Sequence, residues 1–180
     1  MSDELKIRPV LDDETIAFAG RVFQLTRAGQ ADELAELLAM GLPANLRNEK
    51  GDSLLMLACY HGHAGLVRLL LEHGGDTELT NDRGQTPLAG AAFKGDSVIV
   101  QLLLDHGAKV DGCGEDGRTA LMTAAMFNRV EIVDLLLNQG ADPSRRDVGG
   151  LTAGDAARAM GAAETPDQIA EAIRQTERLG

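Results

Sequence analysis

The sequence is poor in aromatic and in basic residues. Its 180 residues include four Phe, one Tyr and no Trp. A core without large rings must be built from aliphatic side chains and alanine, which suit closely stacked helices better than one large globular core. Lys and Arg number 17 against 28 Asp and Glu, so the formal net charge is −11. Because binding to a phosphate backbone needs a basic face, this balance argues against nucleic acid as a partner.

Cysteines and long apolar runs are also scarce. The two cysteines, Cys59 and Cys113, lie at non-equivalent positions of the repeats described below, so we expect free thiols rather than a disulfide. No stretch is long and apolar enough to cross a bilayer, and the first residues, MSDELKIRPVLDDE, contain no apolar run of signal-peptide length. These absences predict a cytoplasmic protein with no membrane partner.

Glycine, by contrast, is abundant and regularly spaced. Three series of glycines recur every 33 residues: Gly51, Gly84, Gly117 and Gly150; Gly41, Gly74, Gly107 and Gly140; and Gly29, Gly62, Gly95 and Gly161. Asn128 fills the remaining place in the third series, and asparagine is among the non-glycine residues that best tolerate positive φ. A fixed period of this length indicates a repeat protein.

The central unit, 82–114, predicts two helices joined by a tight turn. Thr86 and Pro87 fit the N-cap and first position of a short helix that ends near Gly95. Asp96 is placed to cap a second helix, which ends near Gly107 and carries one apolar face formed by Val98, Ile99, Leu102 and Leu103. The polar, glycine-rich residues that follow have no helical period and predict a hairpin-like connection.

The same pattern divides the whole chain. We expect an N-terminal extension (1–15), an N-terminal capping repeat (16–48), three full repeats (49–81, 82–114 and 115–147) and a C-terminal capping repeat with a tail (148–180). Within the last unit, Thr165 and Gln168 have the spacing of a capping box at the start of the final helix. The first helix of each repeat is too short to be stable alone, so the repeats must stack.

The segment Thr86-Pro87-Leu88-Ala89-Gly90-Ala91 resembles the T-P-L-H-x-A signature of ankyrin repeats, and weaker copies begin at Ser53 and Thr119. The signature histidine is replaced by Met56, Ala89 and Met122. This resemblance implies an all-α ankyrin-repeat α-solenoid of stacked helix–turn–helix units joined by β-hairpin-like loops. It also implies that the chain binds another protein, through its hairpin tips and the concave surface of its first helices.

In the register of that family, three pairs of residues occupy exposed positions on the first helices: Tyr60 and His61, Phe93 and Lys94, and Met126 and Phe127. The hairpin tips carry the cations Lys50, Arg83 and Arg118. Rings at exposed positions beside charged residues have the composition of a protein-binding hot spot. The alternative is that these rings fold over neighbouring helices and extend the core.

No motif for catalysis or for metal or cofactor binding stands out. The pair His61-x-His63 has no third ligand nearby, and residues two apart do not share a helix face. The sequence has no nucleophile elbow, zinc-protease motif, P-loop or dinucleotide fingerprint, and Cys59 falls in the buried register. We therefore expect a monomeric, non-enzymatic protein-interaction module that acts as an adaptor, inhibitor or accessory protein, without metal or cofactor. The alternative is a small-molecule binder or enzyme that uses the concave groove.

Overall fold

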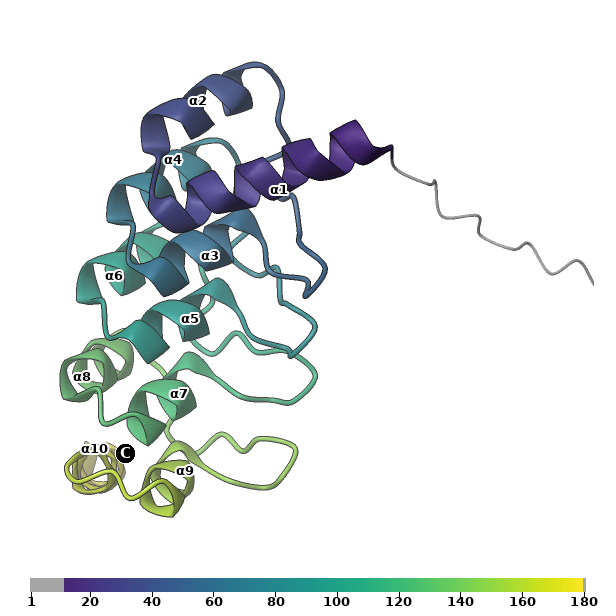
Figure 1. Cartoon of the computed structure of the whole chain (residues 1–180). Helices are drawn as coiled ribbons and strands as arrows, with labels where there is room; N and C mark the ends of the chain where they lie inside the picture. The colour runs from purple at the N-terminus through teal and green to yellow at the C-terminus, as the bar shows by residue number, and fades with distance from the viewer. Residues whose placement is uncertain (1–11, 180) are drawn as a thin grey trace, which may run out of the picture.

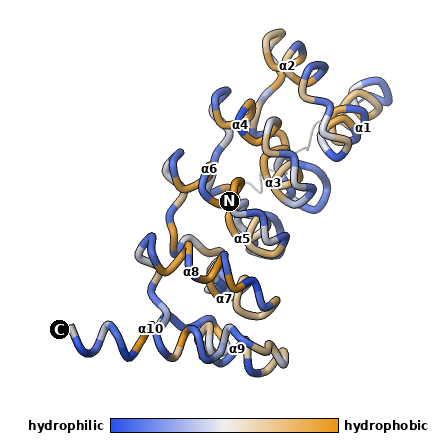
Figure 2. The backbone as a smooth tube through the Cα atoms, turned by 90° about the vertical axis from the view of Figure 1, so that its left-hand side faces the viewer, coloured by the Kyte–Doolittle hydropathy of each residue, from blue (hydrophilic) through white to orange (hydrophobic). Residues whose placement is uncertain are grey.

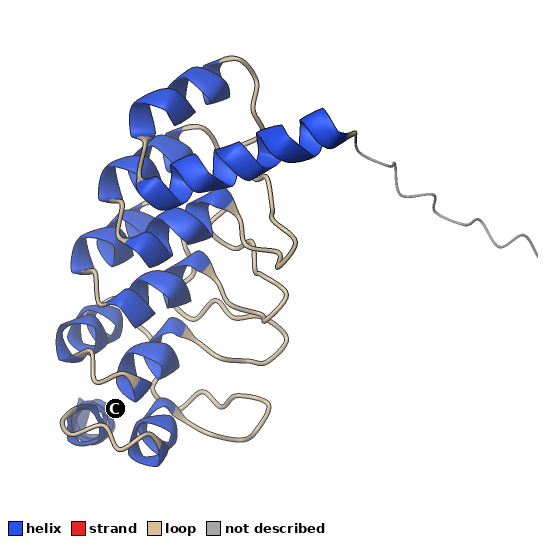
Figure 3. Cartoon of the chain, in the orientation of Figure 1, coloured by secondary structure: helices blue, strands red, loops and turns tan. Residues whose placement is uncertain are grey.

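The computed structural model describes residues 12–179. Residues 1–11, most of the expected N-terminal extension, lie outside this range. Within it the chain forms ten helices and no strand (Figure 3), with one isolated bridge between Arg47 and Ser53. The helices are α1 (Asp13–Ala28), α2 (Ala31–Ala39), α3 (Leu54–His61), α4 (Ala64–Glu72), α5 (Pro87–Lys94), α6 (Ser97–Asp105), α7 (Ala120–Met126), α8 (Val130–Asn138), α9 (Ala153–Ala159) and α10 (Thr165–Leu179).

The helices form two layers that run the length of the molecule (Figure 1). The first helices of the units, α1, α3, α5, α7 and α9, stack in one layer, and the second helices stack beside them. The view turned by 90° shows the same pairs as a staircase from α1–α2 to α9–α10 (Figure 2). The loops between units project from the side of the first helices. The predicted all-α solenoid is confirmed.

Hydroxyl side chains start the first helices in four successive units. Ser53, Thr86, Thr119 and Thr152 each accept a hydrogen bond from the backbone N–H three residues later, at 3.1, 3.1, 3.3 and 3.2 Å. Such caps satisfy N–H groups that have no partner inside the helix. Pro87 occupies the first turn of α5, and Asp96 caps α6 through the N–H of Ile99. The predicted starts of both central helices are therefore correct.

The third glycine series marks the ends of the first helices. Gly29, Gly62 and Gly95 have φ values of 71°, 80° and 82°, and Asn128 has φ 53°. Asn128 is the one non-glycine residue with positive φ in the described part of the chain. The expectation that asparagine replaces glycine at a left-handed position is confirmed.

One expectation about the terminal units needs correction. Helix α1 begins at Asp13, where Asp12 caps it by accepting the N–H of Thr15 at 2.7 Å, and the boundary of the capping repeat at 16 stays a prediction. The capping box predicted for Thr165 and Gln168 is wrong. The Thr165 hydroxyl instead donates to the carbonyl of Ala125 (2.7 Å), and the Gln168 amide donates to the carbonyl of Val130 (2.9 Å). Both side chains therefore tie α10 to α7 and α8.

The core between the layers is aliphatic, as the composition predicts. Among the described residues its largest fully buried side chains are leucines, isoleucines and one methionine, and one aromatic residue, Phe23, is buried. Alanines that are 0% exposed line the contacts between first helices: Ala58, Ala91, Ala92, Ala124 and Ala125. Their small side chains allow the close approach that stacking requires. None of the described helices combines the length and the hydropathy needed to span a bilayer.

Candidate functional site

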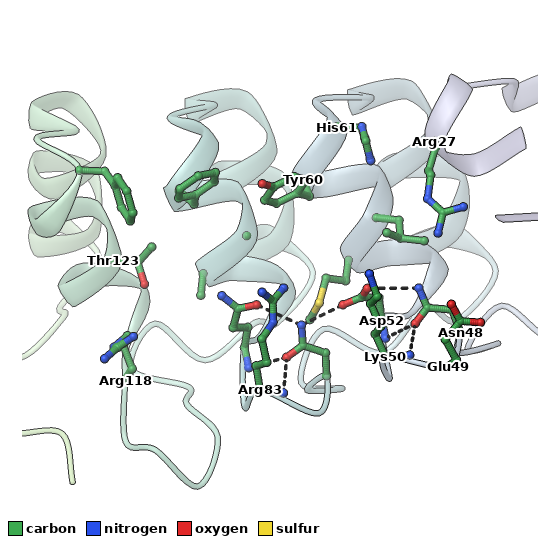
Figure 4. A pocket seen from close by; sticks show the side chains of 18 of the residues that line it. Arg27, Asn48, Glu49, Lys50, Asp52, Tyr60, His61, Arg83, Arg118 and Thr123 are labelled. Carbon is green, nitrogen blue, oxygen red and sulfur yellow. Dashed lines mark hydrogen bonds between the residues drawn. The ribbon is translucent and has the colours of Figure 1, made fainter. Parts of the chain in front are cut away.

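A groove of about 490 Å³ lies between the first-helix layer and the loops that precede it. Its lining comes from the three full repeats and, in the N-terminal capping repeat, from Arg27 near the end of α1 and from Asn48. Figure 4 shows the two sides of this groove, with Tyr60 and His61 on the helices and Lys50, Arg83 and Arg118 on the loops. The groove therefore joins both surfaces on which the sequence places a partner.

Three rings form a continuous row along the helix side of the groove. Tyr60 and Phe93 are stacked, with ring centroids 5.4 Å apart and planes 4° from parallel. Phe93 and Phe127 meet edge to face at 4.6 Å and 85°. Each ring comes from a different repeat, and we call the three residues the aromatic row. Both geometries are favourable for aromatic pairs, so the row is a defined surface rather than three separate rings.

The rings differ in exposure. Tyr60 is 47% exposed and Phe127 is 39% exposed, whereas Phe93 is half-buried because it lies between them. Met126 is also half-buried, in the wall of the groove. The expectation that all four apolar side chains face solvent is thus wrong for Phe93 and Met126. The row nevertheless keeps two exposed rings at its ends.

Phe127 joins the row although it is one residue out of register with Tyr60 and Phe93. Helix α7 ends at Met126, and Phe127 is its C-cap residue, whereas the equivalent residues His61 and Lys94 still belong to α3 and α5. The ring of Phe127 lies against Phe93. Lys94 itself does not line the groove, and its place in the partner-binding surface stays a prediction.

Four cationic side chains line the groove: Arg27, Lys50, Arg83 and Arg118. None of the salt bridges formed among residues 12–179 involves them. The lining carboxylates are Glu49 and Asp52, and Asp52 accepts hydrogen bonds from the amides of Asn48 (3.2 Å) and Asn81 (2.8 Å). The loop side of the groove therefore carries an excess of positive charge.

Asparagine side chains hold two of the cationic loops in shape. The Asn48 side-chain oxygen accepts the N–H groups of Lys50 and Asp52, both at 2.9 Å. The Asn81 oxygen, one repeat later, accepts those of Arg83 and Gln85, both at 3.0 Å. Such turns fix the backbone, so Lys50 and Arg83 project from ordered loops. Neither asparagine was predicted to have this role, although their spacing of 33 residues signals an equivalent role.

Arg27 was also missed as a groove residue. It lies 33 residues before Tyr60, so the repeat register already places it in the same row. Its backbone carbonyl lies 2.8 Å from Nε2 of His63. The capping repeat thus contributes a cation where the next two repeats contribute rings.

The two neighbouring histidines lie closer than the sequence predicts. The rings of His61 and His63 are 6.1 Å apart and nearly parallel, because the chain turns between them at Gly62. No group of three or more candidate metal ligands occurs among the described residues. Burial, together with the positive charge of His63, Arg27 and Lys94, lowers the pKa of His61 below its ordinary value.

Cys59 and Cys113 are free, and neither lines the groove. Cys59 is fully buried, and this burial raises the pKa of its thiol well above the ordinary value. Because the thiolate is the nucleophile, such a cysteine is unreactive.

A family model described as ankyrin repeats, in three copies, matches residues 23–112 and 74–147. A segment of 62 residues, 34% of the chain, is 61% identical to a protein of Pseudomonas aeruginosa named as an ankyrin repeat protein. That match spans 36% of the relative's own length. The family model covers more than half of the chain, and it agrees with the stacked repeats observed in the structure. The chain therefore belongs to the ankyrin-repeat family.

Proposed function

We propose that the chain docks one protein partner in the groove and acts as an adaptor, inhibitor or accessory protein for it. Ankyrin repeats are generally protein-interaction modules. The observation that carries the proposal is the aromatic row, which extends over three repeats and keeps Tyr60 and Phe127 exposed at its ends. Exposed rings beside cations are typical of binding hot spots, because rings bury a large area at a low cost in side-chain entropy.

The distribution of polar groups favours a protein over a small molecule or an enzyme substrate. The volume of the groove alone would suit a small ligand. However, Lys50, Arg83 and Arg118 come from three different loops and do not converge on one point. An elongated ligand can contact all three at once. A polypeptide that crosses the repeats has this shape.

The double substitution of Tyr60→Ala and Phe127→Ala tests the proposal. We expect it to weaken partner binding at least tenfold, about 1.4 kcal/mol, because the substitutions remove the exposed contact area that both rings provide. Affinity capture from a lysate of the source organism, with mass spectrometry, would identify the protein retained by the wild type. Titration of that purified protein would then give the change in Kd.

Met40→Ala with Val98→Ala is the matched control. These side chains are 75% and 60% exposed and do not line the groove. We expect this variant to bind as the wild type does. Far-UV circular dichroism should show that both variants are folded. If the folded Tyr60/Phe127 variant kept wild-type affinity, the partner would dock elsewhere and the proposal would be wrong.

A further inference from the structure

The groove is positively charged on a protein that is negatively charged overall. Four cations and two carboxylates line it, whereas the whole chain has a formal net charge of −11. Three carboxylates on the same loop tips lie outside the groove. Asp82, Glu115 and Asp116 line a second hollow between loops, which Arg83 also lines, and Asp82 lies 3.5 Å from Arg47. These three carboxylates do not line the groove itself, so the cations exceed the carboxylates there.

The two edges of the groove differ in chemistry (Figure 4). The helix edge presents the aromatic row, and the loop edge presents Lys50, Arg83 and Arg118. A ligand lying between them would meet apolar surface on one side and cations on the other. At 0.15 M salt the screening length is about 8 Å, so a ligand in the groove interacts mainly with the charges that line it, of which four are cations and two are carboxylates.

We infer that the groove binds an acidic polypeptide segment, whose carboxylates face the loop cations and whose apolar side chains rest on the aromatic row. This inference rests on the proposed function and adds the chemistry of the partner. In an extended chain, successive side chains point to opposite sides. Alternating acidic and apolar residues would therefore satisfy both edges.

The spacing of the repeats sets the length of the segment. Packed helices lie about 8–10 Å apart, so three successive repeats span roughly 20 Å, although the rings themselves lie closer together, with centroids 5.4 and 4.6 Å apart. An extended chain advances about 3.3 Å per residue, so about six or seven residues cross the three repeats. Each loop cation then lies opposite about three residues of the segment, which is enough to contain one carboxylate.

A nucleic acid strand fits this surface less well. It too would combine negative charge with stacking groups, but strong binding requires several phosphates to be neutralised. The groove supplies only a small excess of positive charge, and the rest of this acidic protein would repel a long polyanion.

A selection from a phage-displayed library of random peptides of about seven residues tests the inference with the full chain. We expect the wild type to enrich peptides that are net negative and contain apolar residues. The enriched peptide is then synthesised and titrated by fluorescence anisotropy. Replacing Arg83→Glu together with Arg118→Glu should weaken its binding at least tenfold, and added salt should weaken wild-type binding.

Arg68→Glu together with Lys109→Glu makes the same change in net charge outside the groove. Both side chains are exposed, and we expect this control to bind the selected peptide as the wild type does. Enrichment of neutral or basic peptides, no enrichment, or equal binding by the two charge-reversed variants would overturn the inference. Tighter binding of an oligothymidylate of about twelve nucleotides would also overturn it, with nucleic acid as the occupant.

The results separate this inference from the proposed function. If the double variant Tyr60→Ala and Phe127→Ala loses binding of the captured partner while the double variant Arg83→Glu and Arg118→Glu keeps it, the docking site is correct. The inference that the bound segment is acidic is then wrong. If neither pair of substitutions affects the captured partner, the docking site itself is wrong.

Discussion

Replacing Leu103 by alanine should lower the free energy of unfolding by about 2–5 kcal/mol, the range for truncating a fully buried leucine. Leu103 is 0% exposed in α6, which packs against α5 within its unit and against α4 and α8 of the neighbouring units. The loss would combine the transfer of apolar atoms with a cavity that rigid neighbours fill poorly. Because stability in a solenoid comes from contacts between adjacent units, a defect in the central unit weakens the stack on both sides.

Val98→Ala provides a control in the same helix. Val98 is 60% exposed, so its truncation should change stability by no more than about 0.5 kcal/mol. Urea denaturation of both variants, followed by circular dichroism, measures the difference. Equal losses for the two substitutions would contradict the assignment of Leu103 to the interface between units.

Gly114→Ala should also destabilise the protein, by about 1–3 kcal/mol. A Cβ atom at Gly114 would collide with the backbone of Gly84 in the preceding loop. Backbone atoms cannot move aside as the end of a flexible side chain can, so the two loops would have to separate. The loops carry Arg83 and Arg118, and the substitution should therefore disturb the groove as well.

Gly20→Ala is the matched change at a site with space. Gly20 lies within α1, and no heavy atom outside the backbone of its own helix lies within 4 Å of a Cβ built there. Alanine in a helix interior is favoured over glycine by roughly 0.5–1 kcal/mol, so this variant should be more stable than the wild type. Thermal unfolding of both variants shows whether each substitution raises or lowers the stability of the protein. A stabilised Gly114→Ala variant would show that the loops are not in close contact.

The regular features of the fold could be read from the sequence because they are local. Thr86 and Pro87 start α5 through contacts within one turn, and the left-handed φ of Asn128 depends on its own backbone. Each such signal appears several times along the chain at the same spacing. Repetition therefore makes the helix pairs and their order predictable.

The contacts that depend on distant segments could not be read in this way. Asn48, Asn81 and Asp147 are equivalent residues whose side-chain oxygens brace their own loops, but Gly114 stands in that series where the preceding loop comes too close for a side chain. Similarly, Thr165 follows the pattern of a local cap but donates to Ala125, 40 residues away. Tertiary contacts override the local signal at both positions.

The candidate site was predictable in outline and not in detail. Repeat register brought Tyr60 and Phe93 together, and the hairpin tips supplied Lys50, Arg83 and Arg118. The contact of Phe127 with Phe93 could not be predicted in this way, because Phe127 is one residue out of register with the other two rings. Arg27 lies in the capping repeat, which carries no hairpin signature.

Hydrogen–deuterium exchange of the protein alone and in complex with its captured partner would show whether the partner binds in the groove. We expect the partner to slow exchange in α3, α5 and α7 and in the loops that carry Lys50, Arg83 and Arg118. Exchange in α4, α6 and α8, on the opposite layer, should remain unchanged. Protection confined to α4, α6 and α8 would contradict the account, because it would place the partner on the other face of the solenoid.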